Sequence, residues 1–111
     1  MNTMSHYLSF IRDKGRPLSE INPGSDEYAL KIDEALKALD ILRETQSAIL
    51  GGDILTGESG VLAYTYDNWY CEQYESESHM DFVKRSLDTA KTYIQEIAKR
   101  SGNDRYVVIV I

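Results

Sequence analysis

The C-terminal stretch Tyr106-Val107-Val108-Ile109-Val110-Ile111 decides the fold of this chain. Five consecutive aliphatic residues end the sequence, whereas a strand with one solvated face would alternate apolar and polar side chains. We therefore predict a strand that is buried on both faces and lies inside a sheet, away from its edges.

Neighbours for this strand are predicted upstream. Residues 48–55 form an apolar run with Gly51 and Gly52 in its middle, a pair that indicates a bulge or a close backbone approach. After a turn at 57–60, residues 61–66 alternate, which predicts an antiparallel hairpin over 48–66. Asp67-Asn68 indicates a turn or bulge before a possible short strand that starts at Trp69.

Three segments have helical periodicity. Residues 3–14 carry an apolar stripe, and residues 25–43 repeat apolar side chains on one face behind a predicted Ser25 cap. A third helix is predicted between Ser78 and Gly102, with an i,i+4 pair between Asp81 and Arg85. The predicted class is α+β: a small, mainly antiparallel sheet of the hairpin and the buried C-terminal strand, packed against two long helices and a short N-terminal helix.

Length and composition describe one ordinary globular domain over residues 1–111. The chain has a mass of 12.6 kDa and is 42% apolar, and no apolar run reaches the roughly 18 residues of a membrane span. A single cysteine, Cys71, excludes an internal disulfide and fits a reducing compartment. Without a signal-peptide pattern at the start, we expect a cytoplasmic protein.

Charge is distributed unevenly along the chain. The formal net charge is −6, yet the forty residues between Arg43 and Lys84 contain eight acids and no lysine or arginine. The same block holds Trp69, the only tryptophan, and four of the eight tyrosines. An acidic, aromatic surface suits a basic protein partner, and it argues against nucleic acid, which needs clustered Lys and Arg.

Catalytic and metal chemistry find little support. His6, His79 and Cys71 do not stand at zinc-ligand spacing, so we expect no metal and no cofactor. Cys71 has no base at a spacing that fixes the two together, and a lone cysteine among aromatic residues is usually a small buried hydrophobe. Asp53 and Asp67 could converge as a carboxylate pair, but solvated acids at the rim of a sheet are the simpler interpretation.

The aromatic residues have two interpretations. One face of a hairpin must be buried, and this accounts for about half of the set. The others would be exposed beside the acids, where Trp and Tyr favour binding hot spots. The set is Tyr64, Tyr66, Trp69, Tyr70 and Tyr74.

Several of these stretches resemble one known family. Gly51-Gly52-Asp53-Ile54, the run from Tyr64 to Tyr70 that includes Asp67-Asn68-Trp69, and Arg85-Ser86 are similar to immunity protein 40, a family of small bacterial proteins encoded beside polymorphic toxins. The resemblance covers about residues 10–95. It implies a non-enzymatic protein that binds its cognate toxin domain and blocks it inside the producing cell.

Our interpretation is an immunity protein that docks on a basic surface of a secreted toxin domain, as a monomer or a homodimer, without nucleic acid or membrane. The alternatives are a small adaptor that dimerises through a sheet edge, and a hydrolase that uses Asp53 and Asp67. We expect Gly51, Gly52 and Trp69 to be structural. The expected partner-binding residues are Asp53, Glu58, Tyr66, Asp67, Tyr70, Glu72, Tyr74, Glu75 and Glu77.

Overall fold

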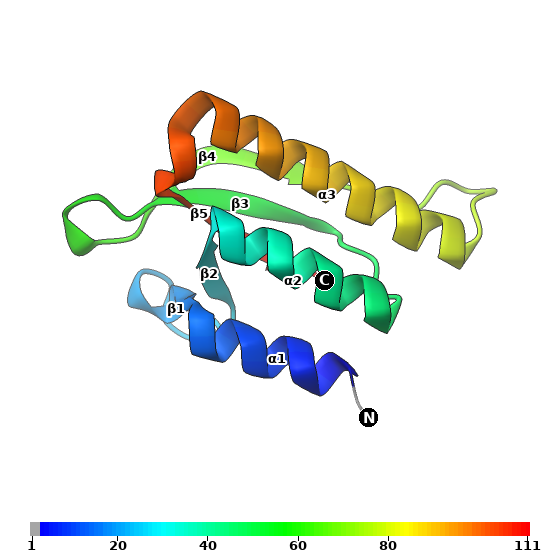
Figure 1. The fold of residues 1–111 in the computed structure, drawn as a ribbon, viewed down its shortest axis with the longest axis horizontal. Helices are drawn as coiled ribbons and strands as arrows, with labels where there is room; N and C mark the ends of the chain where they lie inside the picture. Colours follow the sequence, from blue (N-terminus) through cyan, green and yellow to red (C-terminus); the bar gives the residue numbers. More distant parts are fainter. Residues whose placement is uncertain (1–2) are drawn as a thin grey trace.

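The structure is a computed structural model that describes residues 3–111. In this part of the chain, three helices lie on one face of a five-stranded antiparallel sheet (Figure 1). The helices are α1 (Thr3–Lys14), α2 (Ile32–Thr45) and α3 (His79–Ser101). The strands are β1 (Arg16–Pro17), β2 (Tyr28–Lys31), β3 (Gly51–Thr56), β4 (Ala63–Tyr70) and β5 (Arg105–Val110). The predicted α+β class is confirmed.

The C-terminal strand lies at the centre of the sheet, as predicted. The strand order is β1-β2-β5-β3-β4, so β5 pairs with β2 on one side and with β3 on the other. Val107 and Ile109 belong to the cluster under the helices, and Val108 belongs to a second cluster on the opposite face. Val107 and Val108 have no exposed surface, and fully burying such a side chain contributes about 1.5–3 kcal/mol before conformational entropy is subtracted.

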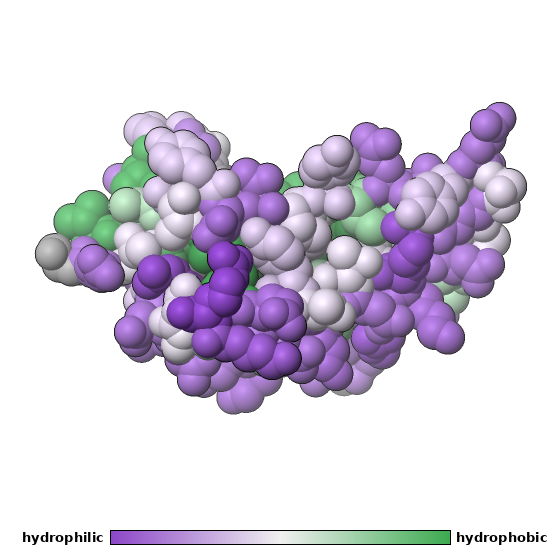
Figure 2. All heavy atoms as spheres, turned by 90° about the horizontal axis from the view of Figure 1, so that it is seen from above, coloured by the Kyte–Doolittle hydropathy of each residue, from purple (hydrophilic) through white to green (hydrophobic). Residues whose placement is uncertain are grey.

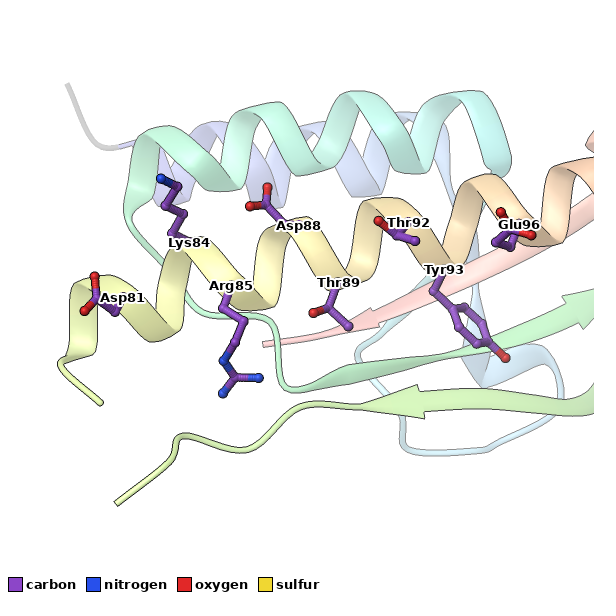
Figure 3. A pocket seen from close by; sticks show the side chains of 8 residues that line it. All are labelled: Asp81, Lys84, Arg85, Asp88, Thr89, Thr92, Tyr93 and Glu96. Carbon is purple, nitrogen blue, oxygen red and sulfur yellow. The ribbon is translucent and has the colours of Figure 1, made fainter. Parts of the chain in front are cut away.

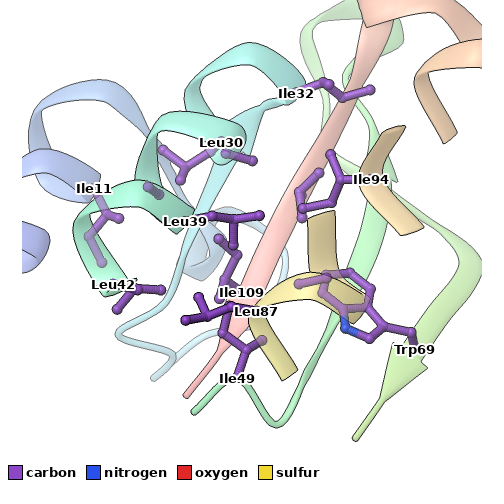
Figure 4. Close-up of a cluster of buried hydrophobic side chains, with 14 of the residues drawn as sticks. Ile11, Leu30, Ile32, Leu39, Leu42, Ile49, Trp69, Leu87, Ile94 and Ile109 are labelled. Atoms are coloured by element: carbon purple, nitrogen blue, oxygen red, sulfur yellow. The ribbon is translucent and has the colours of Figure 1, made fainter. Parts of the chain in front are cut away.

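The main core fills the space between the helices and the sheet. Leu39 and Leu42 from α2 and Leu87 and Ile94 from α3 meet there, and all four are at least 98% buried. Figure 4 shows these side chains converging, with Trp69 from β4 at the far side of the cluster. The helical faces predicted from apolar periodicity are therefore the faces that pack. Among residues 3–111, no helix is long and apolar enough to cross a membrane.

The prediction of one helix over residues 25–43 is wrong at its start. Residues 28–31 form strand β2, and the helix begins only at Ile32. Ser25 does not cap a helix: its Oγ accepts the amide of Glu27 at 3.1 Å, a local turn that competes with helix formation. The central strand β5 needs a partner on this side, and the β2–β5 hydrogen bonds override the local helical pattern.

The third predicted helix has the predicted ends. It runs from His79 to Ser101, Gly102 follows as its C-cap, and the Ser78 Oγ accepts the amide of Asp81 at 3.1 Å. With 23 residues, α3 is the longest element of the described chain and lies beside β4 (Figure 1). Its position beside the edge strand brings its side chains to the acidic, aromatic block.

Candidate functional site

The expected binding residues fall on the edge strand β4 and on the connection from β4 to α3. The predicted hairpin is confirmed, because β3 and β4 pair antiparallel, but β4 continues to Tyr70. Its outer edge is free in the described chain, since β4 ends the strand order. Figure 2 shows the molecule from the side of α3 and β4, where the surface is mostly hydrophilic or intermediate and hydrophobic areas are small.

A wide bulge interrupts β4. Asn68 lies opposite Asp53 and Tyr64 lies opposite Leu55, so residues 65–67 of β4 face the single residue Ile54 of β3. The Thr65 hydroxyl donates to the carbonyl of Ile54 at 2.8 Å and accepts the amide of Asp67 at 3.1 Å. The bulge therefore falls next to the predicted Asp67-Asn68 position, and Thr65 holds its shape.

The bulge decides which aromatic side chains are exposed. Tyr66 has a positive φ of 69° and is 86% exposed, and Tyr70 is 77% exposed. Tyr74, beyond the end of β4, is 63% exposed. The expectation that about half of the five aromatic residues would be buried is wrong, because only Trp69 is buried. The helices reach one face of β4 only near its end, where Trp69 meets α3.

Trp69 packs between the hairpin and α3. Its ring lies 4.9 Å from the ring of Tyr93, centroid to centroid, and the side chain is 8% exposed. A Cβ at Gly52 would collide with the Trp69 ring and would lie 2.5 Å from the carbonyl oxygen of Val108. A Cβ at Gly51 would collide with the backbone of Trp69. The two glycines allow the close backbone approach that their sequence pattern predicts.

Arg85 of α3 is the main organiser of the acidic connection. Its Nε and Nη2 donate to the two carboxylate oxygens of Glu77, both at 2.8 Å. Nη1 lies 3.1 Å from Cys71 Sγ, and Nη2 also donates to the carbonyl of Glu72. The guanidinium carbon lies 3.9 Å from the centroid of the Tyr74 ring, a cation–π contact. Arg85 thus pairs with Glu77, and the predicted pair with Asp81 is wrong.

Glu77 points inward, unlike the other acids of this connection. Its side chain is 10% exposed, and its Oε1 also accepts the amide of Tyr74 at 3.1 Å. Hydrogen bonds from Arg85 are the largest cause that lowers the pKa of Glu77 to about 2, so the carboxylate is ionised at neutral pH. Glu77 therefore shapes this connection, whereas the neighbouring Glu72 and Glu75 are exposed.

The remaining expected site residues are dispersed. Glu58 lies in the short helix η2 (Glu58–Gly60), at the end of the hairpin away from α3, beside Lys31 and Tyr106. Asp53 is half-buried on the face of the sheet opposite the helices, where its charge acts on Glu27. Burial, followed by the charges of Asp26 and Asp53, raises the pKa of Glu27.

The structure separates Asp53 from Asp67. Asp53 acts electrostatically on Glu27, whereas Asp67 contributes to raising the pKa of Tyr93 on α3, after the larger effect of burial. Successive β4 residues point to opposite faces, and Asn68 is the residue that lies opposite Asp53. This arrangement does not bring the two carboxylates together as a hydrolase would require.

A shallow groove of about 620 Å³ runs along α3 and borders the connection. Figure 3 shows Arg85 and Tyr93 projecting from α3 toward the strands, whereas Lys84 and Asp88 point to the other side of the helix. Ser86 provides a second tie to α3, because its buried Oγ accepts the amide of Ile49 at 2.9 Å. Sequence patterns did not identify the role of Arg85, although it is one of the first cations after the acidic block.

The set that the structure brings together runs along the sheet edge from the bulge to the start of α3. We call it the edge surface. Its members come from β4 and from segment 71–78, and each one is exposed. Glu58, Asp53 and Glu77 lie outside it. The edge surface consists of Tyr66, Asp67, Tyr70, Glu72, Tyr74 and Glu75.

Comparison with known proteins gives one match. A family model described as immunity protein 40 matches residues 17–111. The matched range starts later than the predicted resemblance over 10–95 and includes β5, which the resemblance had left out. No curated protein and no solved structure matches the chain. Because the match covers far more than half of the sequence, the chain belongs to the immunity protein 40 family.

Proposed function

We propose that this immunity protein binds and neutralises a cognate bacterial toxin domain in the cytoplasm of the producing cell, and that it does so through the edge surface. Family membership supports a toxin partner and a non-enzymatic role. The observation that carries the choice of surface is the exposure of three tyrosines beside acids. Tyr66, Tyr70 and Tyr74 are 86%, 77% and 63% exposed.

The chemistry of the edge surface favours a basic partner. No lysine or arginine occurs between residues 44 and 83, and the one cation that contacts segment 71–78 from α3 is neutralised by Glu77. Toxins that act on nucleic acids carry basic surfaces because they bind phosphates. An acidic inhibitor would occupy such a surface, with charges that speed association and tyrosines that act as anchors.

Co-expression tests the immunity role. The reading frame immediately upstream would be expressed in a sensitive host with and without this protein, followed by a pull-down of the pair. We expect toxicity that this protein relieves, together with a stable complex. Toxicity without rescue would overturn the proposal.

Charge reversal tests the surface. A triple variant with Asp67→Lys, Glu72→Lys and Glu75→Lys should lose most of its association rate with the toxin, because these acids are exposed and face a basic partner. The matched control carries Asp13→Lys, Asp40→Lys and Glu44→Lys, which alter the net charge equally on exposed sites of α1 and α2. Equal effects of both triples would show that only net charge matters and would sink the edge surface.

Tyrosine truncation tests the anchors. Tyr66→Ala, Tyr70→Ala and Tyr74→Ala remove exposed side chains, so each variant should fold normally. At least one should weaken toxin binding by about 2 kcal/mol or more, as hot-spot aromatics do. Binding within a few tenths of a kcal/mol of the wild type for all three would place the contact elsewhere.

A further inference from the structure

We propose that Arg85 is a positioning residue for toxin recognition, which holds segment 71–78 in the shape that presents Glu72, Tyr74 and Glu75. This inference rests on the proposed function. It goes further by assigning a role to a residue outside the acidic block, on α3. Arg85 would control affinity while leaving the contact itself to the segment.

Segment 71–78 has no helix or strand of its own to hold its shape. A turn at 74–77 closes through the amide of Glu77 and the carbonyl of Tyr74 at 3.0 Å. Beyond Cys71, whose amide donates to Leu50, the ties to the body of the protein converge on the Arg85 side chain. A free loop of this length would lose conformational entropy on binding, and a loop held in advance loses less.

The contacts of Arg85 reach four residues of the segment. The guanidinium bonds both oxygens of Glu77, approaches the sulfur of Cys71, donates to the carbonyl of Glu72 and stacks on the Tyr74 ring. Arginine alone offers a planar group with five donors for such a set. Arg85 is only partly exposed, at 29% of its side chain, whereas Tyr74 on top of it is 63% exposed.

The sign of the charge effect distinguishes positioning from simple electrostatics. Arg85→Gln removes a positive charge from an acidic protein, which by itself would strengthen attraction to a basic toxin. Loss of the ordered segment would weaken binding instead. Lys84→Gln is the matched control: it removes the same charge from the preceding residue, which is exposed and, within residues 3–111, forms no ion pair or side-chain hydrogen bond.

The experiment measures two quantities on the full chain. Amide hydrogen exchange of residues 72–77 reports the order of the segment without any partner. The dissociation constant for the toxin domain encoded immediately upstream reports recognition. We expect Arg85→Gln to accelerate exchange in this segment, with exchange in β3 and β5 unchanged. If the segment then holds the bound shape about a tenth of the time, the dissociation constant rises roughly tenfold relative to Lys84→Gln.

Each other outcome overturns the proposal. Wild-type exchange in Arg85→Gln would show that the segment is held without Arg85. Faster exchange with the dissociation constant of Lys84→Gln would show that order in the segment is irrelevant to recognition. If the wild type binds no toxin, the proposed function fails and the recognition role fails with it, whereas the exchange data still tell whether Arg85 holds the segment.

A second variant keeps the test decisive if Arg85→Gln does not fold. Arg85→Lys retains the positive charge and the aliphatic stem, but an ammonium cannot fork to Glu77 while it contacts Cys71 and Glu72. We expect faster exchange in 72–77 and a weaker complex at unchanged net charge. Wild-type values for both quantities would contradict the role of the guanidinium geometry.

Discussion

At the scale of single residues, Gly52 shows why one pattern had a structural answer. The ring of Trp69 occupies the space above Gly52, and the carbonyl of Val108 closes the other side. Gly52→Ala should destabilise the protein by about 1–3 kcal/mol, since a methyl group must displace packed neighbours. Urea unfolding followed by circular dichroism measures this loss.

A double variant identifies the cause of that loss. In a Trp69→Leu background the ring is gone, so Gly52→Ala should cost less there than in the wild type. Equal costs in both backgrounds would mean that the ring is not what excludes a Cβ at this position.

Glu77 predicts a pH dependence of stability. Its folded pKa, about 2, lies below the ordinary value, so its ionised form stabilises the fold above pH 5. That contribution is lost as the pH falls toward 2. The difference in unfolding free energy between the wild type and Glu77→Gln should therefore be largest near pH 7 and shrink on acidification. A difference that stays constant from pH 7 to pH 2.5 would contradict the ion pair.

Glu27 provides a control of opposite sign. Burial and two nearby carboxylates raise its pKa above the ordinary value. Ionised Glu27 thus opposes folding at neutral pH, and protonation relieves this as the pH falls. Glu27→Gln should stabilise the protein at pH 7, and its advantage should disappear on acidification.

At the scale of elements, the bulge of β4 depends on one hydroxyl. Thr65 bonds the carbonyl of Ile54 and the amide of Asp67, and Thr65→Val keeps the shape but removes both bonds. We expect a loss of about 1–2 kcal/mol in unfolding free energy, because two polar backbone groups lose a partner. Thr56→Val on β3 is the control, since the Thr56 side chain has no such bond within residues 3–111.

The same bulge bears on the open edge of the sheet. An exposed edge strand can pair with another chain, and bulges are one way in which proteins prevent this. In β4 the Thr65 hydroxyl takes the amide of Asp67, and the side chain of Asn68 donates to the carbonyl of Tyr66 at 3.4 Å. Side chains of the strand itself thus occupy backbone groups at the bulge.

At the scale of the whole molecule, these features predict a monomer. One edge of the sheet is the bulged β4, and the other is β1, which has two residues. Neither offers a long regular strand for a second copy. Sedimentation should give the monomer mass of 12.6 kDa at every concentration tested. A mass that rises with concentration would favour the adaptor that dimerises through a sheet edge.

The sequence by itself determined the elements whose signals are local. The ends of α3 follow from Ser78 and Gly102, and the central position of β5 follows from five aliphatic residues that leave no face for water. The α+β class and the hairpin followed in the same way. Apolar periodicity and turn residues report what a segment buries, so these predictions needed no knowledge of distant contacts.

Only the tertiary structure decided the features that depend on distant partners. Residues 28–31 are a strand because β5 requires a neighbour, although their local pattern also fits a helix. Glu77 and Glu75 look alike in the sequence, yet one faces Arg85 and the other faces solvent. The bulge turns Tyr66 outward while Trp69 is buried. The physical reason is that strand pairing and ion pairing join residues far apart in the chain, and composition alone does not specify which residues meet.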